Sequence, residues 1–155
     1  MMNCIDTDVF AIDLIYTKDK RFEVNQQFLE SIKENIGISA GTTIFNLLEL
    51  CGLLSFSNKP QVIEKIFIEF HKDPKILVLY PNFSTNESCL DFFEKLVAKS
   101  MYFIKRKMSF GDALIIWTCE ENNCSTLITW NAKHFENRSD FVRIITPEEF
   151  LKKIE

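Results

Sequence analysis

Hydrophobic residues along the chain form two kinds of pattern: short continuous runs, and longer stretches in which they recur at every third or fourth position. Continuous runs indicate buried strands, whereas the recurrence indicates helices with one apolar face. The runs predict strands at residues 3–6, 36–39, 75–80, 126–130 and 142–145. The recurrent stretches predict helices at residues 8–16, 21–35, 42–54, 60–72, 90–107 and 112–122, and a last helix from Pro147.

The strands and helices alternate along most of the chain, which predicts an α/β fold with a parallel sheet covered by helices on both faces. We expect the apolar run between Pro74 and Pro81 to be a strand buried on both faces. Gly111 is expected to separate the two helices around it. No repeat or linker breaks the pattern, so residues 1–155 are predicted to form a single domain.

Composition limits the class of protein. With 46% hydrophobic and 26% charged residues, the chain is typical of a globular domain that buries a core. Its longest apolar stretches are much shorter than the roughly 20 residues of a membrane-spanning helix. The first residues, MMNCIDTDVF, lack the pattern of a secretory signal. We therefore expect a cytoplasmic protein with no membrane partner.

The cysteines indicate the redox state of the thiols, and the net charge limits the kinds of binding partner. Five cysteines without a C-x-x-C pair indicate reduced thiols, and Cys51 and Cys119 stand in apolar runs that predict burial. The formal net charge of −4 excludes a uniformly basic nucleic-acid clamp but leaves room for local basic patches. Residues 105–107, Lys133 and the cations near residue 20 form such patches, which either meet phosphates or lie on a solvated surface.

Acidic and amide side chains converge on one predicted edge of the sheet. Ligands of open parallel sheets bind beyond the carboxyl ends of the strands. Asp6 ends the first strand, Asn131 follows the fourth, and Asp112 begins the helix that leads into the fourth. Glu49 joins them from the apolar helix 42–54, where a carboxylate is costly unless it is paired, solvated or bound to a cation. Several acids at one edge repel one another, and a divalent cation such as Mg²⁺ or Mn²⁺ would relieve that repulsion.

Each of these residues also has a purely structural interpretation. Asp6 could cap the next helix, Asp112 could be the first-turn acid of a helix capped by Ser109, and Asn131 could serve only a turn. Glu49 could be a paired or surface side chain beside the core stripe of its helix. That stripe is predicted to consist of Ile44, Leu47, Leu48 and Cys51. The joint placement of the polar residues, rather than any one of them, favours a site.

Four segments match a known family and occur in the family's order: IDTDVFAIDLIY, TTIFNLLELCGLL, FGDALIIWTCEENNCSTLITWNAKHF and IITPEEFL. Together they extend over nearly the whole chain. The chain resembles the PIN-domain family of metal-dependent ribonucleases, and within it the VapC-like toxins of prokaryotic toxin–antitoxin pairs. This resemblance implies a three-layer α/β/α fold with a parallel sheet of about five strands in the order 3-2-1-4-5.

The resemblance also implies endonucleolytic hydrolysis of RNA, in which a Mg²⁺ or Mn²⁺ ion activates water and stabilises the developing charge. The family's acids fall on Asp6, Glu49 and Asp112, which would hold the metal. Asn131 occupies the fourth catalytic position, which is often Asp, and an amide there favours either a one-metal site or a second ion bound through water. Asp8 stands where the family usually has Asn, and it could restore part of the lost charge. Members commonly form homodimers, and a small antitoxin protein enters the active site of the toxins.

Two other functions fit parts of this pattern. A catalytically silent PIN-like module that binds RNA or protein agrees with Asn131 and with the acidic composition. A response-regulator-like receiver also gathers acids around Mg²⁺, but it needs a Lys at the end of a late strand, whereas Lys133 lies beyond Asn131. A metal-dependent ribonuclease therefore remains the leading hypothesis.

Overall fold

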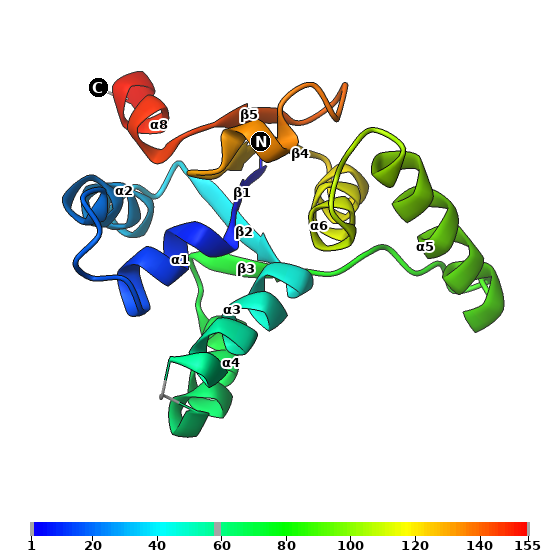
Figure 1. Cartoon of the computed structure of the whole chain (residues 1–155), viewed down its shortest axis with the longest axis horizontal. Coiled ribbons are helices and arrows are strands. Elements are labelled where there is room, and N and C mark those ends of the chain that lie inside the picture. Colours follow the sequence, from blue (N-terminus) through cyan, green and yellow to red (C-terminus); the bar gives the residue numbers. More distant parts are fainter. Residues whose placement is uncertain (1, 58–59, 155) are drawn as a thin grey trace.

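A sheet of five parallel strands forms the centre of the protein, of which a computed structural model describes residues 2–57 and 60–154 (Figure 1). The strands are β1 (Met2–Ile5), β2 (Ser39–Thr43), β3 (Ile76–Leu79), β4 (Cys124–Ile128) and β5 (Arg143–Ile145). Their order across the sheet is β3-β2-β1-β4-β5, which confirms the predicted order 3-2-1-4-5. β1 is the central strand and pairs with both β2 and β4.

Helices connect the strands and cover both faces of the sheet. They are α1 (Thr7–Leu14), α2 (Phe22–Glu34), α3 (Ile44–Phe56), α4 (Ile63–Lys72), α5 (Cys89–Ile104), α6 (Phe110–Glu121), α7 (Ala132–Phe135) and α8 (Pro147–Ile154), with a 3₁₀ turn at Pro60–Val62 before α4. Figure 1 shows α2 and α8 on one side of the sheet and α5 and α6 on the other. Within the described residues, no helix combines the length and the apolarity that crossing a membrane requires.

The two faces of the sheet carry separate hydrophobic cores. Successive side chains of a strand point to opposite faces, so the neighbours Cys4 and Ile5 in β1 belong to different cores. Cys4 packs with Trp117 of α6 and Phe103 of α5, whereas Ile5 packs with residues of α1, α2 and α3. This division is the predicted three-layer α/β/α architecture.

The second strand lies later in the chain than the predicted residues 36–39. Ile36 is 91% exposed, and pairing with β1 begins at Ser39, which lies opposite Met2. The prediction was based on the apolar residues before Ser39, whereas the strand itself has the sequence Ser-Ala-Gly-Thr-Thr. Gly41 is needed within it, because a Cβ atom there would lie 2.9 Å from the Leu77 carbonyl oxygen of β3.

Two further expectations about the elements were wrong. The strand predicted to be buried on both faces, β3, lies at the edge of the sheet, where Leu77 is 48% exposed. Gly111 lies inside α6 and does not separate two helices. The separation falls at residues 105–109, where Lys107 adopts a left-handed conformation with φ 66°. The two helices are separate because the backbone changes conformation at Lys107 and because Ser109 caps the start of α6.

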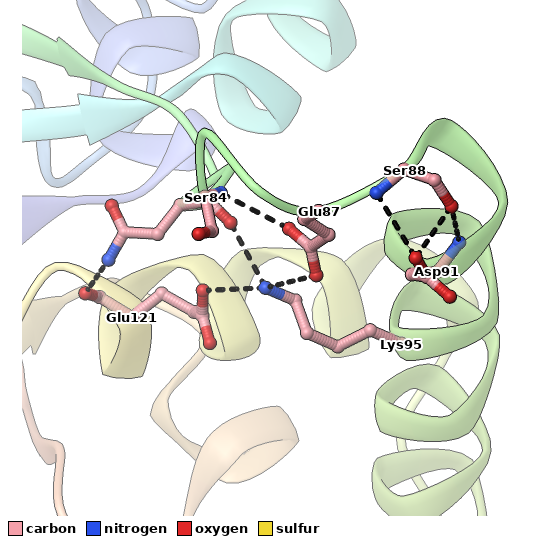
Figure 2. Close-up of polar contacts among 7 residues, drawn as sticks. Ser84, Glu87, Ser88, Asp91, Lys95 and Glu121 are labelled. Carbon is pink, nitrogen blue, oxygen red and sulfur yellow. Dashed lines mark hydrogen bonds and ion pairs between the residues drawn. The ribbon is translucent and has the colours of Figure 1, made fainter.

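The long helix α5 is joined to the body of the protein through a polar cluster around Lys95 (Figure 2). The Lys95 ammonium group lies 3.5 Å from Glu87 and 3.5 Å from Glu121 at the end of α6, and it donates to the Asn82 carbonyl oxygen. Ser88 starts α5 with a reciprocal capping box. These contacts fasten the loop before α5 to α6, whose first turn carries Asp112.

Candidate functional site

A cavity of about 670 Å³ opens where the carboxyl ends of β1 and β4 meet α3 and α6. The four residues predicted for the site line it: Asp6, Glu49, Asp112 and Asn131. Asp8 lines the same cavity, together with the cationic or titratable side chains of Arg21, Lys107, Lys133, His134 and Arg138. The fold therefore brings into one cavity side chains that are up to 132 positions apart, from Asp6 to Arg138.

Asp6 is the most buried acid of the cavity, with 5% of its surface exposed. Its Oδ1 accepts hydrogen bonds from the Thr7 backbone N–H (2.8 Å) and from Asn46 Nδ2 (2.7 Å), and its Oδ2 accepts one from Thr129 Oγ1 (2.7 Å). Burial, followed by repulsion from Asp8, raises the pKa of Asp6 to about 8, although the bonds from Thr129 and Thr7 oppose the shift. The carboxyl group is thus held in a fixed orientation and carries its charge at a cost.

Thr129 and Asp8 connect Asp6 to the turn that carries Asn131. The Thr129 hydroxyl lies 2.7 Å from Asp6 Oδ2 and 3.1 Å from Asp8 Oδ2, and it accepts from the Asn131 backbone N–H (3.0 Å). Asp8 Oδ2 also accepts from the Trp130 backbone N–H (2.9 Å). Burial raises the pKa of Asp8, and these bonds oppose the rise. The other oxygen of Asp8, Oδ1, is buried and has no hydrogen-bond partner among residues 2–57 and 60–154.

Glu49 reaches the cavity from an exposed position on α3. Thr7 Oγ1 donates a hydrogen bond of 2.6 Å to Glu49 Oε2, so the residue after Asp6 also orients this second acid. The expectation that apolar neighbours enclose Glu49 was wrong, because Leu48 beside it is 53% exposed. The buried face of α3 consists of Asn46, Leu47, Leu50 and Leu54, while Ile44 and Cys51 are half-buried. Asn46 joins the buried face, where it forms a capping box with Thr43 and donates to Asp6.

Asp112 stands in the first turn of α6, and the structural role expected for it is present. Its backbone N–H donates to the Ser109 hydroxyl (3.1 Å), which leaves the carboxylate free to face the cavity. Asp112 Oδ2 lies 3.9 Å from His134 Nδ1. Asp6 likewise caps α1 while it lines the cavity. For both acids, capping and lining the cavity are compatible, because capping uses one atom and leaves other lone pairs available.

Cationic side chains line the cavity together with the acids. Arg21 forms a two-point ion pair with Asp19 and lies 5.5 Å from the centre of the Trp130 ring, and its charge lowers the pKa of Asp8. Of the basic run 105–107, Lys107 lines the cavity, whereas Arg106 binds the Arg138 carbonyl oxygen and approaches Asp140. The predicted basic rim is therefore present in part.

The donor set is suited to a hydrated divalent ion. Carboxylate and amide oxygens are the ligands that Mg²⁺ and Mn²⁺ prefer, and the unpartnered Asp8 Oδ1 is an oxygen that a cation or its water would satisfy. Across residues 2–57 and 60–154, no three His, Cys, Asp or Glu side chains are close enough together to coordinate one ion directly. Mg²⁺ commonly keeps several waters and binds through one or two carboxylates. The acids around this cavity fit that mode.

Two residues of the site were not identified from the sequence. Asn46 donates to Asp6 and to Thr7 Oγ1, and Arg138 lines the cavity. A signal for Asn46 does exist, since Thr43 and Asn46 have the spacing of a capping box. No local pattern places Arg138 at the cavity, because its position depends on the packing of the segment that follows α7.

The fold agrees with that of known toxins. Neither a family model nor a curated protein sequence matches the chain. Solved structures match nearly all of it: VapBC-1 from nontypeable Haemophilus influenzae, with 18% identity, a TM-score of 0.61 and coverage of 96% of this chain and 99% of that one; and VapBC2 from Rickettsia felis bound to a promoter DNA fragment, with 17% identity, a TM-score of 0.60 and coverage of 94% and 98%.

A third similar structure is VapC20 from Mycobacterium tuberculosis, described as a sarcin–ricin loop cleaving toxin. Its identity is 14%, its TM-score is 0.57, and the match covers 81% of this chain and 86% of that one. The structural neighbours are thus VapC toxins of VapBC complexes, which have PIN domains. The resemblance inferred from the sequence is confirmed for the fold.

Proposed function

We propose that the protein is a metal-dependent endoribonuclease and the toxin of a toxin–antitoxin pair. The observation that carries this proposal is the convergence of Asp6, Glu49, Asp112 and Asn131 on one cavity that cationic side chains also line. Acids that bind a divalent ion and cations that attract phosphates are the two requirements for cleaving a phosphodiester. The shared fold with VapC20, a toxin that cleaves the sarcin–ricin loop, supports the choice of RNA as substrate.

Asp6, Glu49 and Asp112 would hold the metal, which we propose to be Mg²⁺ or Mn²⁺. Such an ion would polarise the scissile phosphate and make water a stronger nucleophile at neutral pH. The protein's own part is orientation. Thr7 holds Glu49, and the Thr7 backbone, Asn46 and Thr129 hold Asp6.

Asn131 and the cations would act on the substrate. The Asn131 backbone is fixed by Thr129, which leaves its side-chain amide to position water or a substrate phosphate. Lys107, Lys133 and Arg138 line the cavity and would neutralise the phosphates on either side of the cleaved bond. Acids and cations line the cavity together, so the formal net charge of −4 is compatible with an RNA substrate.

The test is cleavage of a mixed RNA substrate by the purified protein with Mg²⁺ or Mn²⁺. Asp6→Asn and Asp112→Asn should each lower the rate by roughly a hundredfold or more, since each removes a charge from the proposed metal site. The matched control is Asp13→Asn, because Asp13 also lies on α1 but lines a different cavity and accepts a hydrogen bond from Gln26. Absence of cleavage with every divalent ion would refute the enzyme.

A catalytically silent module is the second candidate, and Asn131 favours it because an amide replaces the acid usual at that position. Such a protein would bind RNA or another protein through the same cavity. RNA binding that Lys133→Ala weakens, without cleavage under the conditions above, would establish this alternative.

Two partners follow from the proposed toxin role. The similar VapBC structures contain toxin–antitoxin complexes, which supports a small antitoxin as the partner of this chain. We also propose a homodimer, which light scattering of the purified protein would test by its mass.

A further inference from the structure

The cavity that holds the acids also has apolar lining residues. Ala11 and Ile12 of α1, Tyr16 shortly after α1, and Leu53 of α3 line it together with the acids. The helices α1 and α3 pack on the face of the sheet to which Ile5 points. The apolar lining therefore comes from one helical layer of the fold.

Tyr16 presents an open aromatic ring within this lining. It is 50% exposed, whereas Phe135, which also lines the cavity, is 1% exposed. Two backbone hydrogen bonds of 2.9 Å hold Tyr16: its N–H donates to the Ala11 carbonyl oxygen, and its own carbonyl oxygen accepts from the Asp19 N–H. Within the part of the chain that the structure describes, its phenol hydroxyl has no hydrogen-bond partner and its ring has no aromatic neighbour. The backbone is thus fixed, while the ring is left available to a ligand.

The opposite helical layer contributes cations that have no acidic partner. Lys107 precedes α6, Lys133 belongs to α7 and Arg138 follows α7, and both helices pack on the face to which Cys4 points. Among the described residues, none of these three cations forms an ion pair. The Nε–H group of Arg138 is buried and lacks an acceptor there, which is costly. Unpaired cations in one cavity fit the phosphates of a nucleic acid.

The central strand ends between these two layers. Asp6 follows β1, and the last two residues of β1, Cys4 and Ile5, belong to the two different cores. A nucleotide whose phosphate lies at Asp6 would therefore have cations on one side and an exposed aromatic ring on the other. Phosphate and base are the two parts of a nucleotide that these two surfaces suit.

We propose that Tyr16 is the stacking platform for a base of single-stranded RNA, next to the phosphate that the acids would hold. Unpaired RNA bases stack on aromatic side chains, and this contact tolerates any base because every base has a π-face. The inference rests on the RNA substrate proposed above and names the residue that contacts its bases. The unpaired cations of the same cavity favour RNA over an apolar segment of a protein partner.

The experiment measures binding by fluorescence anisotropy in EDTA, so that a metal-dependent nuclease leaves the probe intact. The two labelled probes have equal length: a single-stranded RNA of mixed sequence, and an abasic ribose–phosphate strand. We expect the wild-type protein to bind the RNA roughly tenfold more tightly than the abasic strand, which is the effect of one stacked base. Equal affinities would overturn the proposal without any variant.

Variants assign the effect to the ring. Tyr16→Leu should weaken RNA binding roughly tenfold and leave the affinity for the abasic strand unchanged, because leucine is apolar but has no π-face. Tyr16→Trp should bind the RNA at least as tightly as the wild-type protein does. Tyr80→Leu is the matched control and should change neither affinity, because Tyr80 is 51% exposed but does not line this cavity. An equal loss of both affinities in Tyr16→Leu would overturn the stacking role.

Binding and cleavage give separate answers. Cleavage of RNA with Mg²⁺, together with unchanged RNA binding in Tyr16→Leu, would overturn the role of Tyr16 and leave the proposed ribonuclease intact. Loss of RNA binding alone in Tyr16→Leu, without cleavage under any divalent ion, would support the stacking role and refute the enzyme. Failure of the wild-type protein to bind either probe would overturn the stacking role.

Discussion

At the scale of single residues, the site depends on how firmly neutral donors hold its acids. Asp6 accepts hydrogen bonds from Thr7, Asn46 and Thr129, yet burial and nearby acids raise its pKa to about 8. Orientation is therefore obtained at the expense of stability, as is common for residues arranged for function rather than for folding. Two predictions follow from this balance.

Asp6→Asn should stabilise the metal-free protein at alkaline pH. Between pH about 4 and 8, the folded protein keeps a proton on Asp6 that the unfolded chain releases, so the free energy of unfolding falls as pH rises. The amide removes this dependence and should raise that free energy by at least about 1 kcal/mol at pH 8.5, while little changes at pH 4. Urea denaturation in EDTA at both pH values measures it; equal effects at both would contradict the assigned pKa.

Thr129→Val should destabilise the protein because Thr129 is fully buried. The change removes the donor to Asp6 and the acceptor for the Asn131 N–H, leaving polar groups unpaired at a cost of about 1–3 kcal/mol. Thr129→Ser should restore most of the loss. Thr126→Val is the matched control on β4, since Thr126 is half-buried and its hydroxyl, within the part of the chain that the structure describes, contacts only Ser125, at 3.4 Å. Chemical denaturation that ranks the two valine variants equally would contradict the role of Thr129.

At the scale of the elements, β2 and β3 approach each other closely at one position. Gly41 in β2 lies where a Cβ atom would approach the Leu77 carbonyl oxygen of β3 to 2.9 Å and the Leu79 side chain to 3.0 Å. A backbone carbonyl in a paired strand cannot move away without breaking the ladder. The sheet therefore requires glycine at this position, although β3 is an edge strand.

Gly41→Ala should lower the free energy of unfolding by about 1–3 kcal/mol through this overlap. Gly52→Ala on α3 and Gly111→Ala on α6 are the controls, because a Cβ atom at either glycine meets nothing within 4 Å. Alanine is the better helix former, so each control should raise stability by roughly 0.5–1 kcal/mol. Urea denaturation measures the free energy of unfolding of the three variants. If the strand contact is real, Gly41→Ala lowers this free energy whereas the two controls raise it; a change in the same direction in all three would contradict the contact.

At the scale of the whole molecule, the cavity concentrates negative charge that a divalent ion would offset. Asp6, Asp8, Glu49 and Asp112 line one cavity in a protein whose formal net charge is −4. A ligand that binds only the folded state raises its stability in proportion to the logarithm of the ligand concentration. Ion binding is therefore measurable without any RNA.

Millimolar Mg²⁺ or Mn²⁺ should raise Tm by a few degrees at neutral pH, since about 1 kcal/mol shifts the midpoint of a domain of this size by roughly 2–4 °C. Na⁺ at matched ionic strength should not do so, and Asp112→Asn should reduce the shift whereas Asp13→Asn should not. Differential scanning fluorimetry measures these midpoints. An equal shift in all variants would show that the ion acts elsewhere.

Local pattern was enough to predict most elements and four residues that line the cavity, but not their partners. Continuous apolar runs marked β3, β4 and β5, and capping residues marked Asp6 and Ser109. The strand Ser39–Thr43 was predicted too early in the chain, because its small and polar residues do not form an apolar run. Asn46 was missed because its role depends on contact with Asp6, forty positions away.

The sequence alone determined that this is an α/β chain and that Asp6, Glu49, Asp112 and Asn131 are the residues to consider, since periodicity, capping and residue chemistry are local properties. The tertiary structure alone decided that β3 lies at an edge and that Thr129 bridges Asp6 and Asp8. The physical reason is that strand register and helix docking set contacts between distant residues. Those contacts depend on how both cores pack at once, which no single segment encodes.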